Sequence, residues 1–180
     1  FLSGGVLQTV AEGLYRKAFC SLPSVFFQNT DDRDLFIERR LVKPGQAQLL
    51  PGSGIDLDRF SAAKYPTETK GPVFLMIARV LRDKGVMEFV EAARLVKAKS
   101  PVARFQLLGA VDAANRTAID AATVKSWQDD GTIEYLRTTD DVRPHIAASH
   151  CVVLPSYREG APRTLIEAAA MARPLIATDV

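Results

Sequence analysis

The chain has 180 residues, of which 47% are hydrophobic, which is typical of one globular domain and part of a second. Its 23 basic and 21 acidic residues leave a net charge of +2, which argues against a general nucleic-acid binder. The two cysteines form no CxxC or metal-spaced pattern, which indicates a reducing, cytosolic compartment. No apolar run approaches the ~20 residues that a membrane span needs.

The first 66 residues predict two helices and two short strands. Apolar residues at helical spacing indicate the helices, the second capped by Thr30 or Asp31, and short apolar runs indicate the strands. Two prolines, charges and a glycine at 64–72 predict a linker. Because the chain lacks an initiator Met and stops within a predicted strand, we expect a fragment of a longer protein. The predicted elements are helices at 6–19 and 31–40 and strands at 24–28 and 47–50.

Beyond the predicted linker, strands and helices alternate regularly. The strands are nearly continuous apolar runs, which favours a parallel sheet covered by helices on both faces. We therefore predict a doubly wound, Rossmann-like α/β domain, a fold that binds ligands at the carboxyl ends of its strands. The predicted strands lie at 73–78, 104–109, 133–136, 150–154 and 175–178, and the helices at 85–98, 115–129, about 140–148 and 162–172.

Two cations follow the first strand of this domain. Arg79 and Lys84 both lie in the predicted loop between strand and helix, at the ligand edge of the sheet. A diphosphate needs cations there, because its charge grows as a leaving group departs. The alternative is an ordinary solvated arginine and lysine in a surface loop.

Two glutamates lie eight positions apart where a later strand turns into a helix. Gly160 allows close approach of the backbone to a ligand, Pro162 suits the first helical turn, and the helix N-terminus favours an anion. Glu159 adds negative charge at the same place, which fits a carboxylate facing sugar hydroxyls or a developing positive charge. Glu167, in the second turn, could accept hydrogen bonds from ribose hydroxyls. The alternative is a capping glutamate and a surface glutamate.

With these motifs the chain resembles the retaining GT-B glycosyltransferases of family 4, the group 1 transferases. The resemblance covers nearly the whole chain, and several separated motifs occur in the family's order. The matching segments are 27–32 (FQNTDD), 50–56 (LPGSGID), 78–85 (ARVLRDKG), 158–168 (REGAPRTLIEA) and 173–180 (RPLIATDV).

The resemblance implies two Rossmann-like domains around a cleft. Residues 1–66 would be the last part of the N-terminal domain and the interdomain segment, and residues 67–180 the nucleotide-sugar-binding domain, incomplete at its C-terminus. The acceptor site would lie in the missing part of the N-terminal domain. We therefore expect the isolated chain to be catalytically inactive while retaining donor affinity.

The resemblance also implies roles for individual residues. Arg79 and Lys84 would bind the donor diphosphate, Glu159 would contact the transferred sugar, and Glu167 would bind the ribose. The family needs no metal or other cofactor, since the two cations compensate the charge. Further donor-binding positions are the backbone amides of Gly160 and Ala161, next to Pro162, and the base-contacting loop that begins Leu136, Arg137.

The sequence departs from the family pattern at two of these positions. Arg137 stands where relatives usually have glycine, which puts the base contacts in doubt. Ala161 is smaller than the usual Phe or Leu, which leaves the wall of the sugar pocket uncertain.

The function implied by the resemblance is transfer of a hexose or N-acetylhexosamine from a nucleotide-diphosphate sugar, most simply UDP-linked. The acceptor would be a saccharide or a polyprenyl-linked saccharide in bacterial capsule or lipopolysaccharide synthesis. We expect the protein in the cytoplasm, with the full-length form peripherally associated with the inner face of the membrane.

Three other functions stay open: a GT-B-shaped nucleotide-sugar epimerase, a non-catalytic nucleotide-binding module and a nicotinamide oxidoreductase. The Arg–Lys and Glu-x7-Glu set disfavours the epimerase, and the missing glycine fingerprint disfavours the oxidoreductase. Asp56 and Asp58 fit a metal-binding Asp-x-Asp string but follow a Pro-Gly turn, away from the strand ends. We interpret His150 as a surface or hydrogen-bonded histidine and Trp127 as a core residue.

Overall fold

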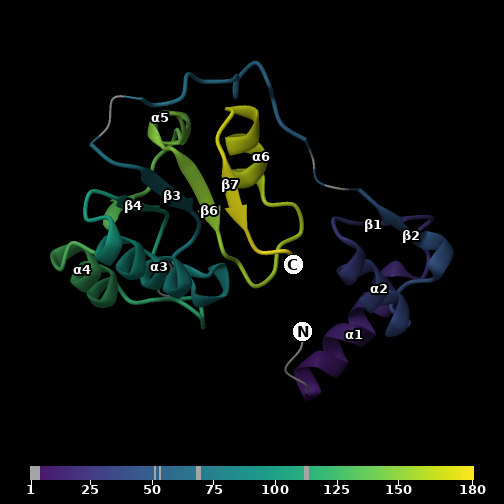
Figure 1. Ribbon diagram of the computed structural model, residues 1–180. Helices are drawn as coiled ribbons and strands as arrows, with labels where there is room; N and C mark the ends of the chain where they lie inside the picture. The colour runs from purple at the N-terminus through teal and green to yellow at the C-terminus, as the bar shows by residue number, and fades with distance from the viewer. Residues whose placement is uncertain (1–4, 51, 53, 68–69, 112–113) are drawn as a thin grey trace. The chain divides into compact units, whose positions relative to one another are not determined.

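A computed structural model describes residues 5–50, 52, 54–67, 70–111 and 114–180 (Figure 1). The chain divides into two compact units, residues 1–53 and 54–180. Residues 54–66, which the sequence interpretation groups with the first part, therefore belong to the second compact unit. The predicted linker at 64–72 begins inside that unit, and residues 68–69 lie outside the described part of the chain.

The first unit contains the two predicted helices and the two predicted short strands, and the strands pair in a parallel sheet. The cap of the second helix was predicted wrongly: the Asn29 side chain accepts the Asp32 N–H at 2.7 Å, which places the helix start one residue earlier. The apolar stripe of the first helix is present, but Leu7, Val10 and Leu14 are exposed within the described residues. The elements are α1 Val6–Phe19, β1 Val25–Phe27, α2 Thr30–Glu38, η1 Pro44–Gln46 and β2 Ala47–Leu49.

The second unit is built on a five-stranded sheet, and every strand pair in it is parallel. The strand order β5-β4-β3-β6-β7 confirms the doubly wound α/β prediction, with a switch in strand order at β3. Its elements are β3 Val73–Ile77, η2 Arg82–Lys84, α3 Val86–Lys99, β4 Arg104–Leu108, α4 Ala121–Asp129, β5 Glu134–Arg137, α5 Arg143–Ala148, β6 Cys151–Leu154, α6 Arg163–Ala170 and β7 Leu175–Ala177.

Helices cover both faces of this sheet, α3 and α4 on one side and α5 and α6 on the other (Figure 1). On the first side Phe89 and Trp127 are buried with the sheet residues, which confirms the interpretation of Trp127 as core. On the second side Ile146 and Ala168 are buried in a separate cluster. Burial on both faces explains why the strands read as continuous apolar runs. A membrane-crossing helix is absent from the described ranges.

The helix predicted at 115–129 begins later than expected, at Ala121. Ala118 forms an isolated antiparallel bridge with Leu81, and such extended pairing excludes helix at that point. The helix starts only where the Asp120 carboxylate accepts the Thr123 N–H at 2.9 Å. A tertiary contact thus overrides the local helical pattern.

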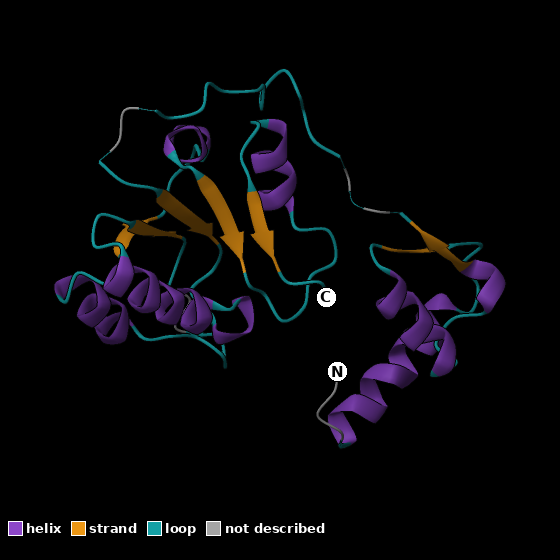
Figure 2. Cartoon of the chain, in the orientation of Figure 1, coloured by secondary structure: helices purple, strands orange, loops and turns teal. Residues whose placement is uncertain are grey.

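Residues 54–67 contain neither helix nor strand (Figure 2), yet they pack on the second unit. Phe60 is 6% exposed and joins the apolar cluster between the sheet and α5 and α6. The guanidinium of Arg173 donates to the carbonyls of Ala63 at 3.2 Å and Lys64 at 2.7 Å. The segment is therefore an integral part of the second unit.

The C-terminus of α6 has a strained residue that offers a test of the fold. Ala172 has φ 58°, and Arg173 N–H bonds the Ala168 carbonyl at 2.9 Å, the Schellman arrangement in which glycine is preferred. We expect Ala172→Gly to raise the free energy of unfolding by about 1 kcal/mol, since an L side chain is strained at this φ. Urea denaturation measures the change. Ala169→Gly is the control, because Ala169 is an exposed position inside the same helix, and this variant should lower stability by a similar amount. A change of the same sign in the free energy of unfolding of both variants would contradict the prediction.

Candidate functional site

The loops that follow β3 and β6 lie side by side at one edge of the sheet. The two strands are paired and parallel, so their carboxyl ends meet there, at the switch in strand order. Gly85 lies at φ 76°, and a Cβ at this position would stand 1.9 Å from the Pro155 carbonyl oxygen. Asp83 O accepts the Tyr157 N–H at 3.0 Å. The two loops are therefore in direct backbone contact.

Lys84 and Glu159 meet where these loops touch. Lys84 Nζ lies 2.6 Å from Glu159 Oε1, and the two side chains are 24% and 17% exposed. The sequence interpretation placed both groups at one crevice, and the structure brings them together as an ion pair. Arg79 lies in the same loop after β3 and is exposed. The edge thus brings Lys84 into contact with Glu159, and Arg79 lies in the same loop as Lys84.

The residues between Glu159 and α6 lead directly into the helix N-terminus. Gly160 is exposed and Ala161 is partly buried, while Pro162 stands at the N-cap position rather than inside the first turn. The N-cap residue Pro162 has no side-chain acceptor, so it does not itself cap the first N–H groups of the helix. The Thr164 hydroxyl donates to the Ile77 carbonyl at 3.3 Å and ties the helix start to the end of β3. This arrangement suits an anion in front of the helix.

Glu167 lies in the second turn of α6, and its side chain is only 13% exposed. Arg163 Nη2 is 3.7 Å from its carboxylate. Burial raises the pKa of Glu167 above its ordinary value, and the charges of Arg163 and Arg59 oppose that rise. The reading of Glu167 as a plain surface glutamate is therefore wrong, because most of the side chain is covered.

Leu136 and Arg137 form the end of β5. Arg137 has φ 61°, in the left-handed region that glycine adopts without strain, which explains physically why glycine is favoured here. Its carbonyl accepts the Gly109 N–H at 2.7 Å. A cavity of about 430 Å³ adjoins Arg137 and is also lined by Val111 and Tyr135. A ligand at this end of the sheet would have an apolar wall beside it.

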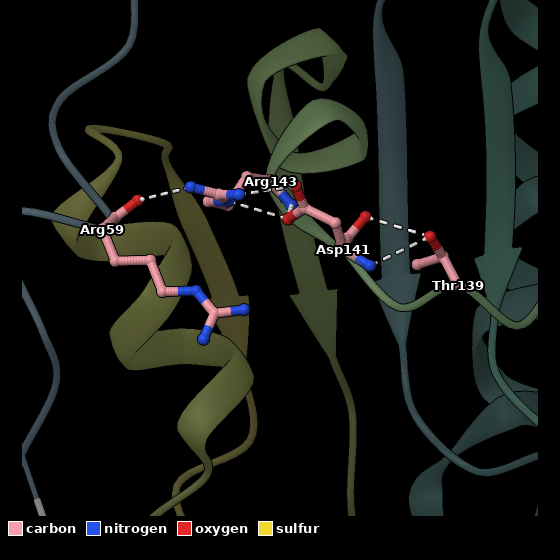
Figure 3. A network of polar contacts seen from close by, with 4 residues as sticks. All are labelled: Arg59, Thr139, Asp141 and Arg143. Carbon is pink, nitrogen blue, oxygen red and sulfur yellow. Dashed lines mark hydrogen bonds and ion pairs between the residues drawn. The ribbon is translucent and has the colours of Figure 1, made fainter.

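The loop after β5 carries a polar network that the sequence interpretation missed (Figure 3). The Arg143 side chain donates two hydrogen bonds of 2.8 Å to the Asp141 carboxylate, and its Nη1 donates to the Arg59 carbonyl at 3.4 Å. The Thr139 hydroxyl accepts the Asp141 N–H at 3.2 Å. The one sequence signal for this network is an aspartate, Asp141, two positions before an arginine, Arg143, at the start of a helix. The network fixes this loop and joins it to segment 54–67 of the same unit.

Acid should weaken this network and remove the stability that it gives to the domain. The hydrogen bonds from the Arg143 side chain and N–H hold the pKa of Asp141 at about 2, below the ordinary 3.8. A depressed carboxyl pKa stabilises the fold above about pH 4, and this contribution is lost as the pH falls towards 2. We expect Asp141→Asn to show a shallower loss of stability between these pH values, measured by denaturant unfolding. Asp140→Asn is the control; superimposable curves for wild type and Asp141→Asn would contradict the prediction.

Other polar residues have local structural partners. The Asp56 carboxylate accepts the N–H groups of Asp58 and Arg59, each at 3.0 Å, so it caps its own turn. His150 Nδ1 accepts the Val73 N–H at 3.0 Å, which confirms a hydrogen-bonded histidine. Across the ranges that the structure describes, no group of three or more His, Cys, Asp or Glu side chains could hold a metal ion.

The sequence and the fold both match known proteins. Residues 71–180, more than half of the chain, match the family described as Glycosyl transferases group 1. An N,N'-diacetylbacillosaminyl-diphospho-undecaprenol alpha-1,3-N-acetylgalactosaminyltransferase of Campylobacter jejuni is 29% identical over 97% of this chain and 47% of its own. A UDP-Gal:alpha-D-GlcNAc-diphosphoundecaprenol alpha-1,3-galactosyltransferase of Escherichia coli is 25% identical over 91% of this chain and 44% of its own.

Solved structures share the fold at low sequence identity. Sucrose-phosphate synthase from Thermosynechococcus elongatus aligns with a TM-score of 0.74 and 20% identity over 99% of this chain and 47% of its own. Anabaena HepE in complex with UDP and glucose aligns with a TM-score of 0.70 and 15% identity over 97% of this chain and 50% of its own. These matches confirm the predicted GT-B fold. The chain spans about half the length of the curated relatives it matches. By its matched residues, the chain belongs to the group 1 family of glycosyl transferases.

Proposed function

We propose that this chain is the donor-binding part of a retaining glycosyltransferase that uses a UDP-linked sugar. The observation that carries the proposal is the Lys84–Glu159 pair, which joins the loops after β3 and β6 at the ligand edge of the sheet. A nucleotide-diphosphate sugar needs a cation for its phosphates and a carboxylate for its sugar within a few ångströms of each other.

Each residue has a defined part in the proposed reaction. Arg79 and Lys84 hold the diphosphate and stabilise the charge that grows on it as the sugar leaves. Glu159 aligns the sugar. The acceptor then attacks the sugar on the same face from which the diphosphate departs. Glu167 accepts hydrogen bonds from the ribose, and its partial burial suits contact with a ligand that excludes water. The two cations supply the charge compensation, so the proposed reaction needs no metal.

The N-terminal amides of α6 supply a further anion-binding element. Gly160 and Ala161 present the backbone in front of the helix, where phosphate or sugar oxygens would lie. The end of β5, with Leu136 and Arg137, is the proposed contact for the base, beside the 430 Å³ cavity. Proline lacks a backbone N–H, and at the cap position of Pro162 the helix does not need one.

We further propose that the acceptor of the whole protein is a lipid-linked saccharide in bacterial surface polysaccharide synthesis. The named acceptors of the Campylobacter jejuni and Escherichia coli relatives are both sugars on diphospho-undecaprenol. A third relative, 34% identical over 58% of this chain, is named a putative teichuronic acid biosynthesis glycosyltransferase of Bacillus subtilis. Transfer would take place at the inner face of the membrane, where the protein meets its lipid-linked substrate.

Titration calorimetry of the chain with UDP, GDP, ADP and NAD tests the donor assignment. We expect heat of binding with UDP and markedly weaker binding of the other three. Binding of NAD alone would overturn the proposal in favour of an oxidoreductase. Binding of GDP or ADP in place of UDP would keep the transferase but change its donor.

A further inference from the structure

A hydrogen bond outside the residues assigned so far also joins the two loops. The Tyr157 hydroxyl lies 2.6 Å from Glu88 Oε1 across the gap between the loop after β6 and the first turn of α3. Tyr157 N–H and the Ser156 hydroxyl both donate to the Asp83 carbonyl, at 3.0 and 3.2 Å. We propose that Tyr157 and Glu88 are positioning residues that hold Lys84 and Glu159 in register for the donor diphosphate.

The places of these residues in the chain support a positioning role. Tyr157 precedes Glu159 by two residues, and Glu88 follows Lys84 by four residues, in the first turn of α3. The phenol–carboxylate bond and the ion pair therefore close a ring between the loop after β6 and the chain from Lys84 to Glu88. A lysine side chain has several rotatable bonds, and fixing both of its ends lowers the conformational freedom lost on binding a ligand. The ring thus preorganises the charged pair.

Core packing does not account for the Tyr157–Glu88 contact. The Tyr157 side chain is 64% exposed, so its ring contributes little to the apolar core. Glu88 lies in the first turn of α3, where the helix dipole stabilises a carboxylate. The hydrogen bond to Glu88 raises the pKa of Tyr157 above its ordinary value, which is consistent with a protonated phenol that donates to the carboxylate. The contact is a directed link between two loops that each carry a donor-binding residue.

The inference rests on the proposed function and predicts a specific pattern of binding. A loosened Lys84 should weaken a ligand that carries a β-phosphate more than one that lacks it. We therefore expect Tyr157→Phe to lower the affinity for UDP about threefold to tenfold, the loss of one charge-assisted hydrogen bond. The affinity for UMP should change less than twofold, and the melting temperature should stay within the error of measurement.

Calorimetry with UDP and UMP on a small set of variants tests the inference. Glu88→Ala should match Tyr157→Phe, the double variant should add no further loss, and Glu88→Gln, which keeps an acceptor for the phenol, should restore most of the UDP affinity. Tyr65→Phe is the matched control, since this exposed tyrosine donates to the His150 carbonyl, outside the two loops.

The outcomes separate failure of the inference from failure of the proposed function. If wild type binds neither UDP nor UMP, the proposed function fails and the inference with it. If wild type binds both and Tyr157→Phe weakens them equally, or weakens neither, the proposed function stands and the positioning role is overturned. Additive losses in the double variant would also overturn it.

Discussion

Replacing Lys84 by methionine is expected to lower the affinity of the chain for UDP by about tenfold to a hundredfold. The substitution keeps a long aliphatic side chain and removes the ammonium that would bind the diphosphate, and a hydrogen bond to a charged group contributes about 1.5–3 kcal/mol. Each 1.4 kcal/mol corresponds to about a factor of ten in affinity. Calorimetry with UDP measures the change directly.

The partner of Lys84 should respond in the opposite direction. Glu159 Oε1 lies 2.6 Å from the Lys84 ammonium, so a bound diphosphate would share that ammonium with a carboxylate that also repels it. We expect Glu159→Gln to bind UDP more tightly than wild type by a few fold, because the competing charge is gone. The same variant should bind a UDP-sugar no better than UDP, since the carboxylate is proposed to align the sugar.

An exposed ion pair on α3 provides the control for both variants. Arg94 Nη1 lies 3.2 Å from Glu91 Oε2, and both side chains are exposed. Arg94→Met should leave the UDP affinity within twofold of wild type. An unchanged affinity in Lys84→Met would remove Lys84 from the site, and weaker UDP binding in Glu159→Gln would show that the carboxylate supports the phosphate instead of competing with it.

The fold could be predicted closely because its strands are buried on both faces. β3 and β6 are continuous apolar runs between turn residues, a pattern that few other elements share. The start of α4 was predicted six residues early because residues 115–120 look helical by composition. Their actual path depends on the bridge between Ala118 and Leu81, a contact that no local pattern reveals.

Part of the candidate site could be predicted from the topology of the sheet. A parallel sheet brings the carboxyl ends of its strands to one edge, so Lys84 and Glu159 could be expected near each other although 75 residues separate them. Their direct pairing could not, because it depends on the left-handed Gly85 packed against Pro155. The Asp141–Arg143 pair was missed because neither residue matches a family motif. The binding roles of these residues stay predictions.

The largest effect on stability is expected at Arg173, a buried arginine that the sequence interpretation placed only within a family motif. Its side chain is 3% exposed and donates to carbonyls of three separate segments: Ala63 and Lys64, Ile146 and Ala147, and its own neighbour Ala172. Burial lowers the pKa of the Arg173 guanidinium, yet a guanidinium stays protonated in proteins. Its charge is therefore balanced entirely by these carbonyl dipoles and by the Tyr65 ring, 5.7 Å away.

Arg173→Met is expected to lower the free energy of unfolding by about 3 kcal/mol or more, because it removes the hydrogen bonds of a buried guanidinium to several carbonyls. Arg173→Lys should recover only part of this loss, because an ammonium cannot donate hydrogen bonds in all the directions in which the planar guanidinium does. Arg104→Met is the control. Arg104 makes two hydrogen bonds of 2.6 Å to Glu134 but is half exposed, and its loss should change stability by no more than about 1 kcal/mol. Equal losses in the two Met variants would mean that burial does not decide the effect.

The same substitution should release the segment that Arg173 holds. Lys64 is exposed, but its carbonyl accepts from Arg173 Nη2 at 2.7 Å, and Ala63 N–H donates to Met171 O at 3.3 Å, so the backbone is held against the domain. Trypsin needs several residues of mobile chain to cleave after a lysine. We expect cleavage after Lys64 to be faster in Arg173→Met than in Arg104→Met under native conditions, measured by mass spectrometry. Because Phe60 in this segment covers the sheet beneath α5 and α6, release of the segment would expose the apolar cluster that supports Glu167 on α6. A single buried guanidinium would then link the stability of the domain to the geometry of its proposed ribose site.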